Sequence, residues 1–371
     1  MNSFSYDKEF ILKYDPEALI LTEGDAQIIV SVKYQGKVFT STFERESGKS
    51  LGWVNYKAFE GPLNNHMNAY GGENRFWLGP EGGVMSPYFE KGTEQVFENW
   101  HTPPAFDSEE WNLIHATGSK ILMSKEMQLI NYAGRQFNLR VDRSVQLLEK
   151  ANVQSALGLN LNNLKSVAYF TENKVTNTGS ISWNETNGTF CTWMLDMFPV
   201  SDQTVMIIPF EAGEGKPATT DYFGEIAEER LKFSDNALFF KADGKSRGKL
   251  GIHPKRVREF AGSYDTENQL LTVVKFDIDN NGQYLNQEWR LDKPLMSGDA
   301  MNAYNDGPLD DGSQMGPFYE LESVSPAFNC APGESVTHNH SVFHFSGSEN
   351  ELNKITEKLL GVSVNEIKQA F

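Results

Sequence analysis

The order of apolar and polar residues predicts a chain made mainly of short β-strands. After residue 18 the sequence contains runs rich in Val, Ile, Thr and aromatic residues, which favour pleated strands. Clusters of Gly, Asn and Asp between the runs accept the positive φ of tight turns, and such turns favour antiparallel sheets over βαβ units. The clearest runs are residues 26–32, 37–43, 120–130, 137–147, 269–276 and 318–324, and the clearest turns are Asn177-Thr178-Gly179, Asn187-Gly188, Asp243-Gly244, Asn281-Gly282 and Asp306-Gly307.

Helical patterns are confined to the two ends of the sequence. Residues 7–14 place their apolar side chains on one side of a short helix, which Pro16 ends. Residues 349–371 predict two further helices, because two serines stand three positions before a glutamate, the spacing of a capping box. These pairs are Ser348 with Glu351 and Ser363 with Glu366. No repeat or linker interrupts the chain, so the sequence predicts a single domain over residues 1–371.

Composition and charge exclude several classes of partner. Hydrophobic residues make up 39% of the chain and aromatic residues 12%, enough for a sizeable core. The 33 Lys and Arg residues face 50 Asp and Glu residues, and the resulting charge of −17 repels phosphate backbones and anionic lipids. No stretch has the apolar length needed to span a bilayer. We therefore expect no nucleic-acid partner and no membrane partner.

The cysteines and the first residues bear on the compartment. Cys191 and Cys330 form neither a disulfide framework nor a zinc-site spacing. They can pair across the fold, but two free buried thiols are the favoured interpretation. The sequence begins without a basic segment followed by an apolar run, so we expect a cytoplasmic protein, or a periplasmic or secreted one if a leader has been removed.

The densest cluster of polar and aromatic side chains surrounds Arg75. If residues 73–79 are extended, Glu73, Arg75 and Trp77 point to one face. A sugar presents hydroxyl edges and an apolar C–H face, so a charged group beside a tryptophan suits a sugar site. In the alternative interpretation, Arg75 forms an internal ion pair with Glu73 or Glu81, and Trp77 belongs to the core.

Two later segments carry carboxylates. Asn305 and Asp306 stand before a glycine, where they either face a ligand or form an Asx turn without one. Residues 318–324 place Glu320 and Glu322 on one face of a strand, about 7 Å apart by the strand rise. If these carboxylates are buried, repulsion and desolvation raise the pKa of at least one and make it a useful acid or base. If they lie in water, they are only a solvated face.

Three histidines lie close together near the end of the sequence. His338, His340 and His344 share one face if residues 337–345 are extended. An H-x-H pair on a strand can ligate a metal, but no fourth ligand is recognisable. Hydrogen-bonded or substrate-facing histidines are the favoured alternative, and we expect neither a metal nor a cofactor.

The order of these motifs resembles the galactose mutarotase-like superfamily, and most closely a group of unknown function within it. The resemblance extends over nearly the whole chain. It implies an all-β fold, a supersandwich of antiparallel β-sheets with a sugar-binding cleft, in addition to the short helices expected at the two ends of the chain. The motifs that carry it are residues 71–83, 175–179, 304–308, 319–323 and 332–335.

The resemblance also implies roles for individual residues. In aldose epimerases a glutamate on a late strand takes the proton of the anomeric hydroxyl, while a histidine protonates the ring oxygen. The glutamate matches Glu322, with Glu320 as the alternative register, and the substrate-binding Asn-Arg pair matches Asn74 and Arg75.

The acid histidine of these epimerases has no counterpart at the matching position. Residues 189–195 correspond to its strand and contain no histidine. His66, His338 and His340 are the candidates for supplying the proton from elsewhere.

Three functions remain open at this point. The first is an enzyme that acts on sugars, epimerase-like or a lyase or hydrolase, with Glu322 and a second acid or base. The second is a carbohydrate-binding protein without catalysis, and the third is a structural partner protein. The expected ligand is a small or oligomeric carbohydrate, and the oligomeric state is open. The residues expected to line one cleft are Arg75, Trp77, Glu81, Asp306 and Glu322, with Glu320, Asn74, Asn305, His66, His338 and His340 as further candidates.

Overall fold

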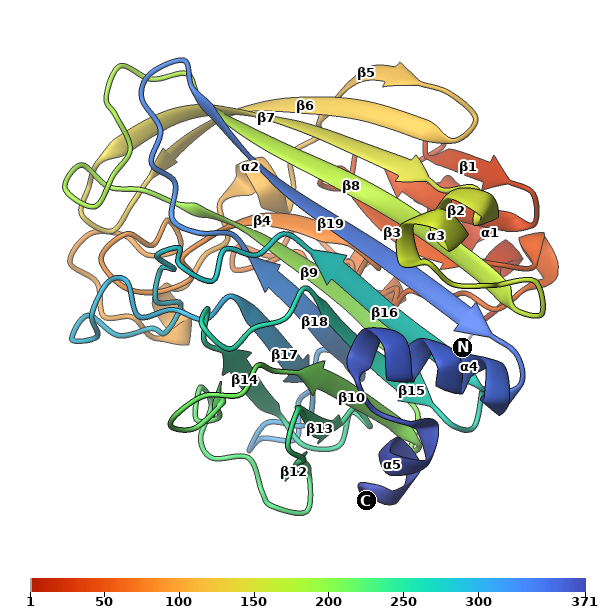
Figure 1. Cartoon of the computed structure of the whole chain (residues 1–371). Helices are drawn as coiled ribbons and strands as arrows, with labels where there is room; N and C mark the ends of the chain where they lie inside the picture. Colours follow the sequence, from red (N-terminus) through yellow and green to blue (C-terminus); the bar gives the residue numbers. More distant parts are fainter. Residues whose placement is uncertain (1) are drawn as a thin grey trace.

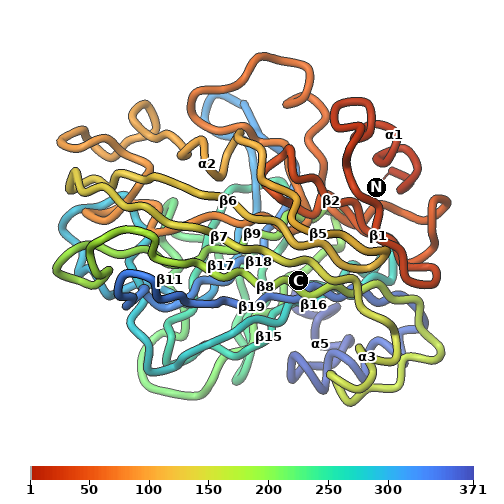
Figure 2. Tube along the Cα trace, turned by 90° about the horizontal axis from the view of Figure 1, so that it is seen from above, coloured from red at the N-terminus to blue at the C-terminus, as the bar shows by residue number. Residues whose placement is uncertain are grey.

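The computed structural model describes residues 2–371, and its largest element is a curved sheet of ten antiparallel strands (Figure 1). The strand β19 lies in the middle of this sheet and joins β16 on one side to β8 on the other. Seen from above, β6, β7, β8 and β19 cross the molecule side by side (Figure 2). In spatial order the strands are β12 (Leu231–Phe233), β13 (Ala237–Lys241), β10 (Thr204–Pro209), β15 (Phe260–Asp265), β16 (Leu270–Phe276), β19 (Ser335–Ser346), β8 (Lys165–Asn177), β7 (Gln136–Leu147), β6 (Lys120–Ile130) and β5 (Asn112–Ala116).

A second sheet of six strands packs beneath the first. Its strand pairs are all antiparallel as well. In spatial order the strands are β11 (Ala218–Thr219), β14 (Gly248–Ile252), β17 (Met301–Asn305), β18 (Phe318–Val324), β9 (Cys191–Pro199) and β4 (Arg75–Gly79). Both cysteines are free and buried, as expected from the sequence.

A third, small sheet lies near the N-terminus and packs with the first helix. Its strands are β1 (Leu19–Glu23), β2 (Ala26–Ser31) and β3 (Lys37–Thr42). The helix α1 (Phe4–Tyr14) ends where the sequence predicts but begins earlier, because the Ser3 hydroxyl accepts from the Tyr6 amide and caps its first turn. The aromatic face of α1 packs on a core cluster that includes Phe39.

Short helices also close the C-terminal end, as the sequence predicts. They are α4 (Glu349–Ile355), a π-helical turn (Thr356–Leu360) and α5 (Val364–Gln369). The predicted capping box of Ser363 and Glu366 is present. Ser348 is the N-cap residue of α4, but its side chain bonds no helix amide, so the capping box predicted there is not formed. Two helices were not predicted, α2 (Pro104–Asp107) and α3 (Lys150–Leu157).

The prediction of a mainly antiparallel β protein is therefore confirmed. Within residues 2–371 no helix is both long enough and apolar enough to pass through a bilayer.

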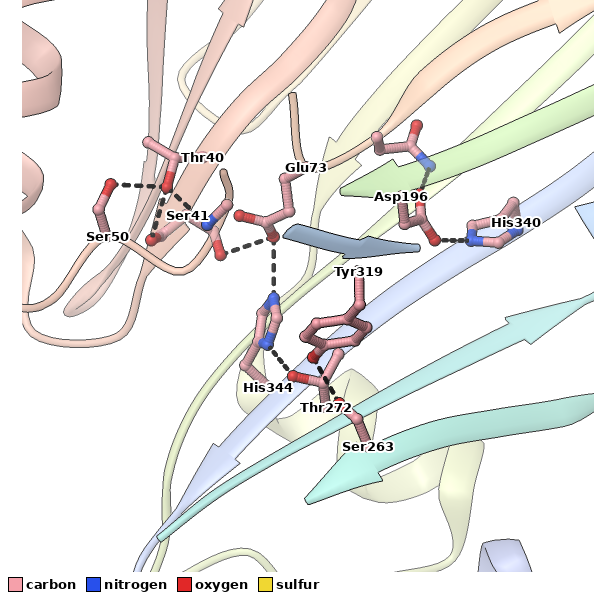
Figure 3. A network of polar contacts seen from close by, with 12 residues as sticks. Thr40, Ser41, Ser50, Glu73, Asp196, Ser263, Thr272, Tyr319, His340 and His344 are labelled. Atoms are coloured by element: carbon pink, nitrogen blue, oxygen red, sulfur yellow. Dashed lines mark hydrogen bonds and ion pairs between the residues drawn. The ribbon is translucent and has the colours of Figure 1, made fainter. Parts of the chain in front are cut away.

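A layer of hydrogen-bonded polar side chains lies between the two large sheets (Figure 3). His340 on β19 approaches Asp196 on β9, with 2.6 Å between Nε2 and Oδ2, and its Nδ1 lies 2.9 Å from the hydroxyl of Ser323 on β18. His344 on the same strand contacts Glu73, with 3.0 Å between Nε2 and Oε1. Buried polar groups are costly unless they are paired, so these bonds fix how the sheets lie on each other.

Candidate functional site

A cavity opens on the face of the six-stranded sheet that points away from the ten-stranded sheet. Its inner part, of about 140 Å³, lies against β4, β9 and β18. Its outer part, of about 530 Å³, lies among the loops around Tyr222, Trp289 and Gln314. Eight residues line both parts, so the two are continuous. The outer volume is within the range of about 300–1,000 Å³ that is typical of ligand pockets.

The strand register explains which side chains reach the cavity. Along β18, Tyr319 and Ser323 turn toward the ten-stranded sheet, where they bond Ser263 and His340, so Glu320 and Glu322 point the other way. Neighbouring strands align their residues with these two glutamates. Lys249, Tyr304, Glu320 and Met197 stand in one row across the sheet, and Asn302, Glu322, Leu195 and Arg75 stand in the next.

Aromatic rings form most of the walls. Trp77 and Trp193 are paired across β4 and β9, with their ring centroids 5.6 Å apart. Rings of this kind can pack on the apolar face of a sugar, while polar groups between them bond its hydroxyls. The aromatic side chains that line the cavity are Trp77, Phe97, Trp100, Trp193, Tyr222, Phe223, Trp289, Tyr304 and Phe318.

Glu320 is paired with Arg75 at the floor of the inner part. The Arg75 Nη2 group donates to Glu320 Oε1 at 2.6 Å, and both side chains are nearly buried. The guanidinium also lies over the Trp77 ring, 5.0 Å from its centroid. Burial raises the pKa of Glu320; Arg75 opposes this, while the nearby Glu322 adds to it. The Glu320 carboxyl therefore holds a proton at higher pH than an ordinary glutamate.

Glu322 lies one row further along and is fully buried. Its Oε2 accepts from Trp193 Nε1 at 2.7 Å and from Lys249 Nζ at 2.9 Å, whereas its Oε1 has no hydrogen-bond partner. Burial is the largest influence on the Lys249 ammonium and acts to lower its pKa, but attraction to Glu322, Glu81 and Glu320 outweighs burial and raises that pKa. Lys249 thus stays charged in the cavity wall, 4.8 Å from the Trp193 ring centroid.

Glu81 enters the cavity from the loop after β4. Its amide donates to Gln287 Oε1 at 2.6 Å, and its carbonyl accepts from Ser86 at 2.5 Å. The next residue has to be a glycine, because a Cβ on Gly82 would lie 2.1 Å from the carbonyl oxygen of Glu288. Burial raises the pKa of Glu81 to about 7, Lys249 opposes this and Glu322 adds to it.

The structure brings part of the predicted set together. Arg75, Trp77, Glu81 and Glu320 line the inner part of the cavity, and Asp306 lines the outer part. Glu322 lies directly behind the wall and touches the cavity through Lys249. Because Arg75 pairs with Glu320, neither predicted internal partner of Arg75 applies.

Other predicted residues lie elsewhere. Asn74, His338 and His340 point into the polar layer between the sheets. The Asn74 amide donates to Asp196, and His338 lies 2.8 Å from the Ser323 hydroxyl. His340 contacts both Asp196 and Ser323. The expectation that Glu73 shares a face with Arg75 is also wrong, because Glu73 bonds His344 inside the sandwich.

Asn305 and His66 also lie outside the cavity wall. The Asn305 amide donates to the Ser246 carbonyl at 2.9 Å and holds the turn before β14. His66 stands behind the wall, where its ring stacks on Phe97 and its Nδ1 lies 2.6 Å from the Trp100 carbonyl. These positions give neither residue a direct contact with a bound ligand.

Sequence reasoning missed several lining residues, of which Arg247, Lys249, Glu288 and Arg290 carry charge. Lys249 is the one charged residue in the otherwise apolar strand β14, which is buried throughout. A single cation in an otherwise apolar strand could have indicated that Lys249 belongs to the site. Trp100, Phe223 and Trp289 come from loops, whose course no local pattern predicts. Among residues 2–371, no three or more His, Cys, Asp or Glu side chains are grouped so that they could hold a metal ion.

Solved structures of galactose mutarotase-like proteins share this fold, as the sequence resemblance implies. A candidate aldose 1-epimerase from Escherichia coli K12 aligns with a TM-score of 0.52 at 14% identity, over 88% of this chain and 98% of that one. A galactose mutarotase-like protein from Lactobacillus casei ATCC 334 aligns with the same TM-score at 10% identity, over 88% and 99% of the two chains. At these identities the likeness concerns the fold.

Comparisons of sequence lead to a family rather than to a characterised relative. No curated protein matches the chain. One family model matches residues 2–371, and its description is that of a family of unknown function. The chain therefore belongs to the family of unknown function DUF6786.

Proposed function

We propose that the chain processes a carbohydrate in this cavity by acid–base chemistry of Glu320 and Glu81. The observation that carries the proposal is the pair of carboxyls with raised pKa in the inner part of one aromatic-walled cavity. Carboxyls whose pKa lies near neutrality are effective acids and bases. The mutarotase-like fold supports a sugar as the ligand.

The reaction that fits is the opening and reclosing of a sugar ring. In this proposal Glu81, whose pKa burial raises to about 7, is the ionised base that takes the proton of the anomeric hydroxyl. Glu320 is the protonated acid that gives its proton to the ring oxygen as the bond between that oxygen and the anomeric carbon breaks. The open-chain aldehyde then recloses on either face, and both protons return to the groups they left.

The neighbouring cations support these roles without taking part in proton transfer. Arg75 holds the Glu320 carboxyl through the 2.6 Å hydrogen bond and is itself supported by the Trp77 ring. Lys249 places a positive charge beside the cavity, where it stabilises negative charge that develops on the sugar oxygens.

The test is the rate at which a panel of aldoses interconverts between anomers, followed by polarimetry or NMR. Glu320→Gln should lower kcat about 100-fold or more, because the amide keeps the shape but cannot deliver the proton. The rate should also fall below about pH 7, as Glu81 takes up a proton, and again at higher pH as Glu320 loses its proton. Glu172→Gln, an exposed position on β8, is the matched control. An unchanged rate in Glu320→Gln would show that the assignment is wrong.

A second candidate is a carbohydrate-binding protein without catalysis. It is favoured by β9, which presents Trp193, Leu195 and Met197 to the cavity, where the resemblance to aldose epimerases implies a histidine. In that case the wild-type chain binds sugars, detected by a change in tryptophan fluorescence, but does not accelerate their interconversion.

A further inference from the structure

The cavity carries more positive charge than the chain as a whole predicts. The chain has 33 Lys and Arg residues against 50 Asp and Glu residues, yet Arg75, Arg247 and Lys249 all line the inner part of the cavity. Two of these cations each contact a carboxyl group, since Arg75 contacts Glu320 and Lys249 contacts Glu322. Arg247 is therefore the cation that needs an explanation.

Arg247 has no carboxylate partner in the part of the chain that the structure describes, residues 2–371, where no Asp or Glu oxygen lies within 4.0 Å of its guanidinium nitrogens. Asp306, which also lines the outer part of the cavity, is engaged elsewhere, since it accepts from the Tyr304 hydroxyl at 3.0 Å and from the Gly316 amide at 2.8 Å. Arg247 is exposed and lines both parts of the cavity, so its charge stands where they join.

The guanidinium is oriented by an aromatic ring. Its central carbon lies 3.8 Å from the centroid of the Phe223 ring, which occupies one face of the planar group. The N–H groups point outward in the plane of the guanidinium. Two parallel hydrogen bonds from that edge match the geometry of a carboxylate.

The backbone that carries Arg247 is held in place. The Asn305 amide donates to the Ser246 carbonyl, and the Gly244 amide donates to Asn305 Oδ1 at 3.0 Å. Gly307 packs so closely that a Cβ there would lie 2.3 Å from the Arg247 amide nitrogen. The arginine is thus presented on a rigid turn, which is how a specificity-determining group is kept in register with a ligand.

We infer that the sugar bound at the proposed site is acidic and that Arg247 binds its carboxylate, with Phe223 as the platform that orients the arginine. This inference rests on the proposed function. A neutral sugar that covers Arg247 would remove water from an unpaired charge without replacing it by an anion. A uronate supplies that anion and leaves its ring to the tryptophans of the inner part.

The test compares each acidic sugar with its neutral parent on the wild-type chain, by calorimetry and tryptophan fluorescence. The pairs are glucuronate with glucose and galacturonate with galactose, and glucose 6-sulfate and glucose 6-phosphate serve as tetrahedral anions. Wild type should bind each uronate at least about 10-fold tighter than its neutral parent, a difference of 1.4 kcal/mol. Raising the salt concentration should reduce that preference.

Arg247→Met should abolish the preference for uronates while the affinity for neutral sugars stays within about twofold. Arg247→Lys should recover only part of it, because an ammonium cannot form the two parallel bonds. The matched control is Arg258→Met, a half-buried arginine that pairs with Glu211 outside the cavity, and it should keep the full preference.

Each outcome counts for or against the inference. Equal affinity of wild type for uronates and neutral sugars would overturn it and leave the proposed function intact, and so would a preference that survives in Arg247→Met. If the sulfate or phosphate ester binds more tightly than the uronates, Arg247 binds a tetrahedral anion, and the inference that it binds a carboxylate is wrong. If no sugar binds, both the proposed function and the inference are wrong.

Discussion

Lys249→Met tests how the buried ion pair behind the cavity is held together. In the native chain Glu322 is fully buried and receives hydrogen bonds only from Trp193 and Lys249, both at Oε2. Methionine has a similar length and fits the same space, so the main change is the loss of one charge. The Glu322 carboxylate would then stay buried with the Trp193 indole as its one donor.

The expected loss of stability follows from that environment. Removing one partner of a buried ion pair costs about 3–5 kcal/mol, because the other charge stays uncompensated. The unfolding entropy is about 2.1 cal/mol/K per residue. For 371 residues unfolding in one transition, a loss of about 4 kcal/mol lowers Tm by about 5 °C.

The measurement is chemical and thermal unfolding at pH 8, followed by circular dichroism. The control is Lys245→Met, which breaks an exposed pair with Asp202 and should leave the free energy of unfolding unchanged. The double variant Lys249→Met/Glu322→Gln should recover most of the loss, because neither charge then remains. If Lys249→Met unfolds like Lys245→Met at pH 8, or if the double variant is no better than the single one, the account of this pair is refuted.

Two further predictions concern the interior of the sandwich. Asp196→Leu should lower the free energy of unfolding by about 3 kcal/mol or more in urea denaturation, since it leaves the Asn74 amide and the His340 ring without their acceptor; a loss below about 1 kcal/mol would contradict the importance of the polar layer. Burial raises the pKa of the Cys191 thiol to about 12 and also raises that of Cys330, so both stay protonated at pH 8 and should react with a thiol reagent only after unfolding. Rapid labelling of either cysteine in the native protein would argue against that burial.

The sequence could predict which side chains share one face of a strand, because side chains alternate between the two faces. It placed Glu320 with Glu322, and Arg75 with Trp77, on the correct shared faces. It could not say which face of a strand meets a ligand and which meets the other sheet. Here the inner face is itself polar, so His340 and the outward-facing Glu320 follow equally polar patterns, and only the packing of two distant sheets separates their roles.

Some elements and lining residues had no clear signal. The helix α3 has only two buried side chains, Val153 and Leu157, and is too short for its apolar period to stand out from a loop. Trp289 and Phe223 reach the cavity from irregular segments, and the position of Trp289 depends on the close backbone contact of Gly82 with residues 288 and 289. Contacts of that kind come from tertiary packing and leave no periodic pattern in the sequence.

The place of β19 in the ten-stranded sheet has a consequence for how the chain folds during synthesis. β8 ends at Asn177, but its partner β19 begins only at Ser335, and β19 also pairs with β16. Until residues 335–346 emerge from the ribosome, β8 and β16 each have an unpaired edge, and that of β16 is mostly apolar. Such edges recruit strands from other chains, and sheets that close through distant pairings form slowly. The nascent protein therefore has a long interval in which aggregation competes with folding, and a chain truncated before β19 would remain in that state.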